Sequence, residues 1–130
     1  MTLVKPRPAV PPKPGLRVLV VEDEVMISML VEDMLAELGH QVVAFAASVE
    51  EAASLAADAE FDAALLDVNL NGQTVDLIAE ALARRGKPFI FTTGYGQRGI
   101  PQAYKDRPLL PKPYQMEQLG QALVQAVNRR

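Results

Sequence analysis

From Arg17 onward, short apolar runs alternate with segments whose apolar residues recur at helical spacing. The first run, Val18 to Val21, is uninterrupted and rich in β-branched residues, which is typical of a central strand in a parallel sheet. Further strands are predicted at 41–45, 63–66, 88–92 and 109–110. Alternating strands and helices joined by right-handed crossovers favour a parallel sheet with helices on both faces. The predicted fold class is therefore α/β, with a doubly wound five-stranded sheet.

The helices are predicted from apolar stripes and from residues that begin and end helices. The first helix is expected to bury a stripe made of Ile27, Leu30, Val31, Met34 and Leu38. Ser48 and Glu51 form a capping box that opens a helix to about Ala57. Other helices are expected at 74–85, weakly around 101–106, and from Met116 to the C-terminal end. Five strand–helix units result.

Composition limits the function. Residues 1–15 hold five of the ten prolines and three basic residues, which predicts a disordered tail before a single domain at 16–130. The rest carries ten basic and sixteen acidic residues, an excess of acid that argues against nucleic-acid binding. No cysteine is present, so thiolate metal sites and disulfides are excluded. No apolar run could span a bilayer, so we expect a cytoplasmic protein without a membrane partner.

Chemistry-bearing residues follow the predicted strands at their carboxyl ends, where open parallel sheets bind ligands. Glu22 and Asp23 follow the first strand, Asp67 the third, Thr93 the fourth and Lys112 the fifth. At an effective dielectric of about 20, carboxylates about 4 Å apart repel by roughly 4 kcal/mol per pair. Such a cluster persists if a cation occupies it or if one acid stays protonated. The all-oxygen set favours a hard divalent cation, and Mg²⁺ fits best because it keeps open positions for phosphoryl oxygens.

Phosphoryl transfer needs positioning and charge neutralisation more than covalent help from the protein. A carboxylate can itself be the nucleophile and form an acyl phosphate, and Asp67 is the central candidate. Lys112 supplies an ammonium group, and the following Pro113 disfavours helical geometry there. Thr93 is the candidate hydroxyl.

The strand-end motifs resemble those of bacterial response-regulator receiver domains. They are Val-Val-Glu22-Asp23-Glu, Leu-Leu-Asp67-Val-Asn69, Thr93-Gly94 and Lys112-Pro113. The four motifs occur in order, and the resemblance covers the chain from Leu16 to Arg130. It implies a flavodoxin-like (βα)5 receiver fold with strand order 2-1-3-4-5.

The resemblance also implies roles. The implied Mg²⁺ ligands are Asp23, Asp67, the backbone carbonyl of Asn69 and, through a water molecule, Glu22. Asp67 would take a phosphoryl group from a sensor histidine kinase or a histidine phosphotransfer protein. Lys112 would bind the phosphoryl oxygens, Thr93 would be the switch hydroxyl, and Gly94 would leave room for the donor imidazole.

The string Phe91-Thr-Thr-Gly-Tyr-Gly96 is similar to the FATGUY subgroup of receivers, many of which are stand-alone domains of alphaproteobacterial signalling, including the general stress response. This implies a single-domain response regulator, a monomer or weak dimer, that binds a downstream partner through residues 94–106. Beyond slow self-dephosphorylation, no enzyme activity is expected. Three features depart from the family pattern: Asn71 replaces a usual proline, Leu109 replaces a usual aromatic switch residue, and the helix near 101–106 is short.

Two other functions compete with this interpretation. A receiver-like scaffold that works without phosphorylation is suggested by Leu109. A phosphatase with an aspartyl nucleophile also places an aspartate after a parallel strand. That class usually has a second acid two residues later, where this chain has Asn69, and it needs a cap-sized insertion that is missing here.

Overall fold

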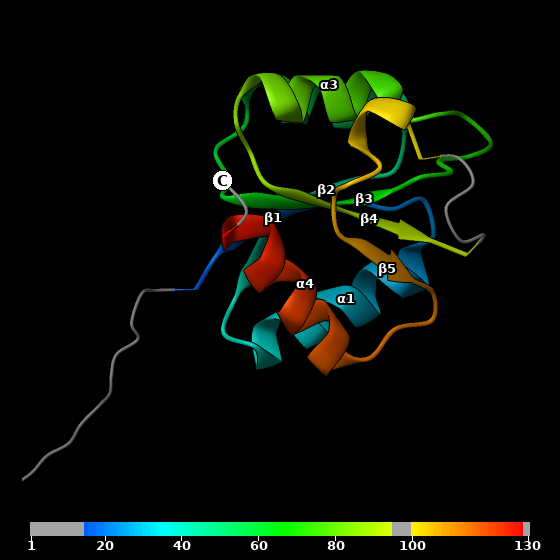
Figure 1. The fold of residues 1–130 in the computed structure, drawn as a ribbon. Coiled ribbons are helices and arrows are strands. Elements are labelled where there is room, and N and C mark those ends of the chain that lie inside the picture. Colours follow the sequence, from blue (N-terminus) through cyan, green and yellow to red (C-terminus); the bar gives the residue numbers. More distant parts are fainter. Residues whose placement is uncertain (1–14, 95–99, 129–130) are drawn as a thin grey trace, which may run out of the picture.

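The computed structural model describes residues 15–94 and 100–128, which form one five-stranded sheet. The strands are β1 (Arg17–Val21), β2 (Gln41–Ala46), β3 (Ala63–Asp67), β4 (Phe89–Thr93) and β5 (Leu109–Pro111). All neighbouring strands are parallel, and their order is β2-β1-β3-β4-β5 (Figure 1). The predicted fold class and strand order are confirmed.

Four α-helices cover the two faces of the sheet in the described part of the chain. They are α1 (Val25–Glu37), α2 (Val49–Asp58), α3 (Asp76–Arg84) and α4 (Met116–Asn128). Successive strand residues point to opposite faces, so Leu66 packs with α2 and α3 whereas Leu65 packs with α1 and α4. Figure 1 shows α3 on one side of the sheet and α1 with α4 on the other. The result is a three-layer domain with two separate apolar cores.

The crossover between β4 and β5 differs from the expectation of five strand–helix units. In place of the helix predicted at 101–106, the described residues hold a single 3-10 turn, η1 (Gln102–Tyr104). Prolines 101 and 108 bound this segment and limit helical hydrogen bonding, and its main apolar anchor is Tyr104. The Tyr104 ring packs edge-on against Phe89, with centroids 5.7 Å apart. A segment this short cannot cover the sheet as a full helix would.

The first helix buries most of the predicted stripe, because Val31 is buried and Ile27, Met34 and Leu38 are partly buried against the core. Leu30 is 53% exposed, whereas Val31 and Leu35 are buried. The prediction that Leu30 is buried was therefore wrong, because Leu35 occupies the core-facing position. The predicted capping box is present: the Glu51 N–H donates to Ser48 Oγ at 3.2 Å.

Two other predictions concern the chain outside the central sheet. The proline-rich tail lies outside the described residues except for Gly15, so the tail stays a prediction. Gly15 packs so closely against Gly39 that a Cβ atom on it would overlap the Gly39 carbonyl oxygen. Within 15–94 and 100–128, no helix has the length and apolar character to span a bilayer.

Candidate functional site

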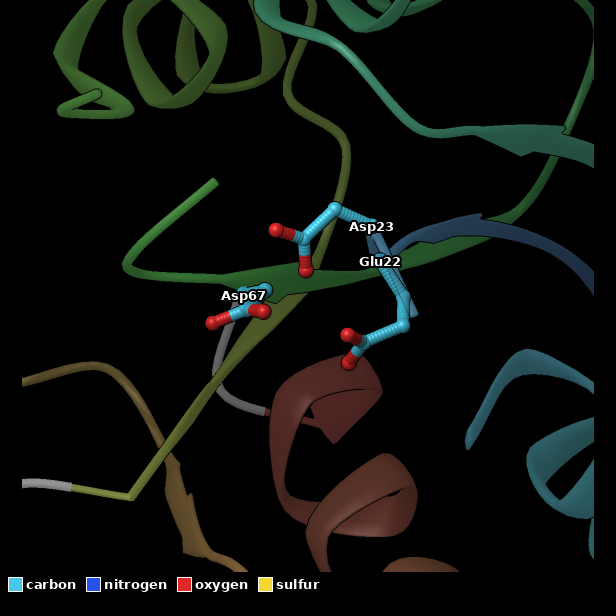
Figure 2. A group of neighbouring side chains, drawn as sticks. All are labelled: Glu22, Asp23 and Asp67. Carbon is cyan, nitrogen blue, oxygen red and sulfur yellow. The ribbon is translucent and has the colours of Figure 1, made fainter. Parts of the chain in front are cut away.

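The parallel sheet brings three carboxylates together at one edge. Glu22 and Asp23 directly follow β1, and Asp67 is the last residue of the adjacent β3. Each of the three offers an oxygen, and these oxygens all lie within 4.8 Å of one another. Figure 2 shows the side chains projecting from the ends of the two strands toward a common space. The predicted clustering of Glu22, Asp23 and Asp67 is therefore present in the structure.

Lys112 reaches this cluster from the far side of β4. Its Nζ lies 2.8 Å from Glu22 Oε1 and 3.2 Å from Asp67 Oδ2. Its backbone N–H donates to the Thr93 carbonyl at 2.7 Å, which continues the β4–β5 pairing one residue beyond β5. The peptide bond to Pro113 is cis. Lys112 is thus held at the strand end, with its ammonium group between two acids.

Burial and mutual charge perturb the ionisable groups. Burial and the negative charge of Asp67 raise the pKa of the Glu22 carboxyl, although hydrogen bonds from Lys112 and from the Glu24 N–H oppose the shift. For Lys112, burial alone would lower the pKa, but hydrogen bonds and charges from Glu22 and Asp67 outweigh it and raise the pKa. Burial, together with the charges of Glu22 and Asp67, also raises the pKa of the Tyr114 hydroxyl. The Tyr114 ring therefore lies close enough to the acids to feel their charge.

Asp67 is buried and oriented by two donors. Its side chain accepts the Asn69 N–H on Oδ1 at 3.1 Å and the Lys112 ammonium on Oδ2. The loop after β3 closes on itself, because the Gly72 N–H donates to Asn69 Oδ1 at 2.8 Å. A hollow of about 520 Å³ opens above Asp67, and its lining residues are Asp23, Glu24, Asp67, Asn69, Gly72, Gly94 and Lys112. The buried carboxylate is thus accessible from one direction.

The residues fit a hard divalent cation. Three carboxylates against one ammonium leave this cluster with a net charge of −2 when all four groups are ionised. The donors are oxygens only, which suits Mg²⁺ better than a soft metal ion. Asp23 and Asn69 line the hollow, whereas Glu22 lies beside Lys112, deeper in the sheet edge.

Thr93 occupies a different position from the other predicted residues. It is the last residue of β4 and is 1% exposed. Its neighbour Gly94 lines the hollow, and Thr93 itself does not. The structure thus brings Thr93 to the edge of the site through its backbone contact with Lys112, and its role as the switch hydroxyl stays a prediction.

An apolar groove adjoins the charged cluster, and sequence reasoning did not identify it. The groove has a volume of about 490 Å³ and is lined by Met26, Ile27, Leu30, Val31, Met34, Lys112, Pro113 and Tyr114. Met26 and Leu30 are 81% and 53% exposed and both line the groove, and adjoining exposed apolar side chains are typical of an interaction surface. Lys112 lines both the groove and the hollow, so the two openings lie on either side of this residue. The only available signal was the excess of apolar residues early in α1.

Comparison with known proteins agrees with this geometry. The family model described as response regulator receiver domain matches residues 18–124. The chain belongs to the response regulator receiver family. Receivers are generally signalling domains with an acidic Mg²⁺ site, and the cluster of three carboxylates agrees with that property.

Three relatives show the range of proteins that resemble this receiver. The transcriptional regulatory protein PdtaR of Mycobacterium tuberculosis is 32% identical over 117 residues, which cover 87% of this chain and 57% of PdtaR. The phyllosphere-induced regulator PhyR of Methylorubrum extorquens is 29% identical, covering 85% of this chain and 43% of PhyR. The chain therefore spans about half the length of these curated relatives.

The third relative is SdrG of Sphingomonas melonis Fr1, whose solution structure aligns with a TM-score of 0.77 and 39% identity, covering 86% of this chain and 96% of that one. A second SdrG structure, assigned to Pseudomonas melonis Fr1, represents its BeF3-activated conformation. It aligns with a TM-score of 0.71 and 38% identity, covering 85% of this chain and 95% of that one.

Proposed function

We propose that this receiver accepts a phosphoryl group on Asp67 and signals by binding a partner protein. One observation carries the proposal: a buried carboxylate is oriented by Asn69 and Lys112 at the base of an open, acidic hollow. The existence of a BeF3-activated form of SdrG supports it, because BeF3 imitates a phosphoryl group on a carboxylate. The partner would contact the 94–106 region, of which residues 95–99 lie outside the described residues.

In the proposed phosphoryl transfer, Asp67 is the nucleophile and Lys112 neutralises charge. A carboxylate oxygen of Asp67 attacks phosphorus, so that a P–O bond forms while the bond from phosphorus to the donor nitrogen breaks. The electron pair of the broken bond returns to the donor imidazole. The Lys112 ammonium, already 3.2 Å from Asp67 Oδ2, neutralises charge on the transferred group.

Mg²⁺ would be held by Asp23, Asp67 and the Asn69 carbonyl, with Glu22 acting through water. When bound, the ion neutralises the excess acid and polarises phosphoryl oxygens. Glu22 and Lys112 would meanwhile keep their 2.8 Å ion pair next to the cation.

The apolar groove favours a protein phosphodonor over a small-molecule substrate. We assign the groove to a helix of the histidine-bearing donor, because the groove runs from exposed Met26 and Leu30 to Lys112, which also lines the acceptor hollow. A donor helix bound in the groove would position its histidine over Asp67.

The first experiment measures intact mass after treatment with acetyl phosphate, with Mg²⁺ or with EDTA. Wild type should gain the mass of one phosphoryl group only with Mg²⁺, and Asp67→Asn should gain none. Glu24→Gln is the matched control, since Glu24 lines the same hollow outside the acidic cluster, and it should still be modified. No adduct on wild type under any condition would refute phosphoacceptance and favour the scaffold that works without phosphorylation.

The groove is tested separately with Leu30→Glu. This variant should react normally with acetyl phosphate but should accept phosphate much more slowly from any phosphohistidine protein that phosphorylates wild type. Leu77→Glu is the control, because Leu77 is also an exposed leucine (66%) but lies on α3, on the other face of the sheet. If the phosphohistidine protein phosphorylated Leu30→Glu and Leu77→Glu at the same rate, the groove would not be part of the donor interface.

A further inference from the structure

Asn71 lies in the loop between β3 and α3 and has a left-handed backbone, with φ of 55°. Its backbone N–H donates to Asp23 Oδ2 at 2.9 Å, and its side-chain Nδ2 donates to the Ala47 carbonyl at 3.0 Å. Asparagine is one of the few residues other than glycine that adopts this conformation readily. The backbone angle and both hydrogen bonds therefore depend on the kind of residue at position 71.

These two bonds join three loops at the ligand-binding edge of the sheet. Asp23 belongs to the loop after β1, Ala47 to the loop after β2, and Asn71 to the loop after β3. Within the last loop, the Gly72 N–H donates to Asn69 and Leu70 pairs with Gln73, while the Leu70 side chain is buried in the apolar core. The two hydrogen bonds of Asn71 tie this turn to both neighbouring loops.

We propose that Asn71 is a positioning residue for the cation, a role that rests on the proposed metal-dependent function. Its N–H fixes one oxygen of Asp23 and leaves the other oxygen for the ion. The same bond ties the loop after β3 to Asp23, and so holds the Asn69 carbonyl, two residues earlier, beside that acid; the bond to Ala47 gives the turn a smaller additional support. Groups that orient metal ligands from behind typically contribute about 10- to 100-fold in metal affinity. Asn71 would thus assemble two ligands from different strands before the ion arrives.

The test compares Mg²⁺ affinity, measured by isothermal titration calorimetry, in wild type, Asn71→Pro and Asn71→Gly. Proline lacks the N–H and holds φ near about −65°, so it removes the Asp23 bond and the left-handed turn. Glycine keeps both and loses only the bond to Ala47. We expect Asn71→Pro to bind about 10-fold more weakly or worse, and Asn71→Gly to stay within about threefold of wild type. Urea unfolding of the metal-free variants checks that all three are folded.

A second measurement does not depend on the proline variant. In metal-free protein, the Asn71 amide proton should move upfield and exchange faster with solvent in Asp23→Ala than in wild type, because its acceptor is gone. Glu24→Ala, which removes a neighbouring acid that lines the same hollow, should leave that proton unchanged.

Different results would overturn the metal-dependent function and the positioning role of Asn71. Wild-type protein that binds no Mg²⁺ would overturn the metal-dependent function and this inference with it. Wild type that binds Mg²⁺ no more tightly than folded Asn71→Pro would overturn the role of Asn71 alone. A higher affinity in Asn71→Pro would also overturn it, since the hydrogen bond would then compete with the ion. If Asp23→Ala changed neither the chemical shift nor the exchange rate of the Asn71 amide proton, the hydrogen bond to Asp23 would not persist in solution.

Discussion

Replacing Asp67 with asparagine should stabilise the metal-free protein, although it removes the proposed phosphoacceptor. Asp67 is 4% exposed, and its oxygens share a space with those of Glu22 and Asp23, all within 4.8 Å. At an effective dielectric of about 20, each of these two pairs repels by about 3.5 kcal/mol. Lys112 Nζ, 3.2 Å from Asp67 Oδ2, returns about 5 kcal/mol of attraction. The balance is a net repulsion of about 2 kcal/mol that a neutral side chain would remove.

Asparagine has nearly the same shape as aspartate, and its side-chain oxygen can still accept the Asn69 N–H, although its amide nitrogen cannot accept the hydrogen bond from Lys112. We therefore expect urea unfolding in EDTA to give Asp67→Asn a free energy of unfolding about 2 kcal/mol higher than that of wild type. Excess Mg²⁺ should reverse the order. A ligand at 100 times its Kd stabilises the protein that binds it by about 2.7 kcal/mol, and the asparagine variant binds the ion less well.

Asp33→Asn is the matched control, since Asp33 is exposed on α1 and lies outside the acidic cluster. Its effect should be within about 0.5 kcal/mol in either buffer. The reasoning is refuted if Asp67→Asn is no more stable than wild type in EDTA, because the three carboxylates would then not repel one another as their separations require. A gain that persists unchanged in Mg²⁺ would refute the cation site instead.

Two further predictions concern the other charged groups. Lys112→Met should lower the free energy of unfolding of the metal-free protein by about 3 kcal/mol, because it leaves Glu22 and Asp67 buried without their cation; urea unfolding with and without Mg²⁺ measures the loss and its partial recovery. The side-chain hydrogen bond from Arg17 lowers the pKa of the Asp62 carboxyl, so this bond stabilises the fold above the ordinary pKa and is lost as pH falls through the lowered one. Asp62→Asn should thus be less stable than wild type at neutral pH and equally stable in strong acid, and an equal difference at both pH values would contradict this.

Much of the fold and most of the site could be predicted because their signals are local in sequence. Each strand is a short apolar run, and a parallel sheet necessarily gathers the residues that follow those runs. The sequence therefore predicts that Glu22, Asp67 and Lys112 lie together, as the structure shows. The exposure of Leu30 was not predictable from its spacing, because Leu35 offers an equally regular stripe. Whether Leu30 or Leu35 is buried depends on the rotation of α1 about its own axis, which is set by its packing against the sheet.

The contacts of Asn71 lay beyond sequence reasoning for a different reason. Its two hydrogen bonds reach across 48 and 24 residues, and a positive φ leaves no periodic pattern. The departure from the family's proline marked the position without indicating its partners. Long-range polar contacts of loop residues depend on the assembled sheet, so they appear only once the strand ends are side by side.

The charge imbalance at the sheet edge separates a functional site from a stabilising network. Arg17 with Asp62 and Arg84 with Glu80 are surface pairs in which each charge meets one opposite charge. At the strand ends, one ammonium instead serves three carboxylates, of which Glu22 and Asp67 are buried. Burying uncompensated charge costs stability, so packing alone does not favour this arrangement. The cluster needs two more positive charges to become neutral, which is the charge of one divalent cation. An incoming phosphoryl group is also negative, so we expect it to bind beside that ion and Lys112. The instability of the metal-free cluster is thus the physical basis of its expected affinity for Mg²⁺.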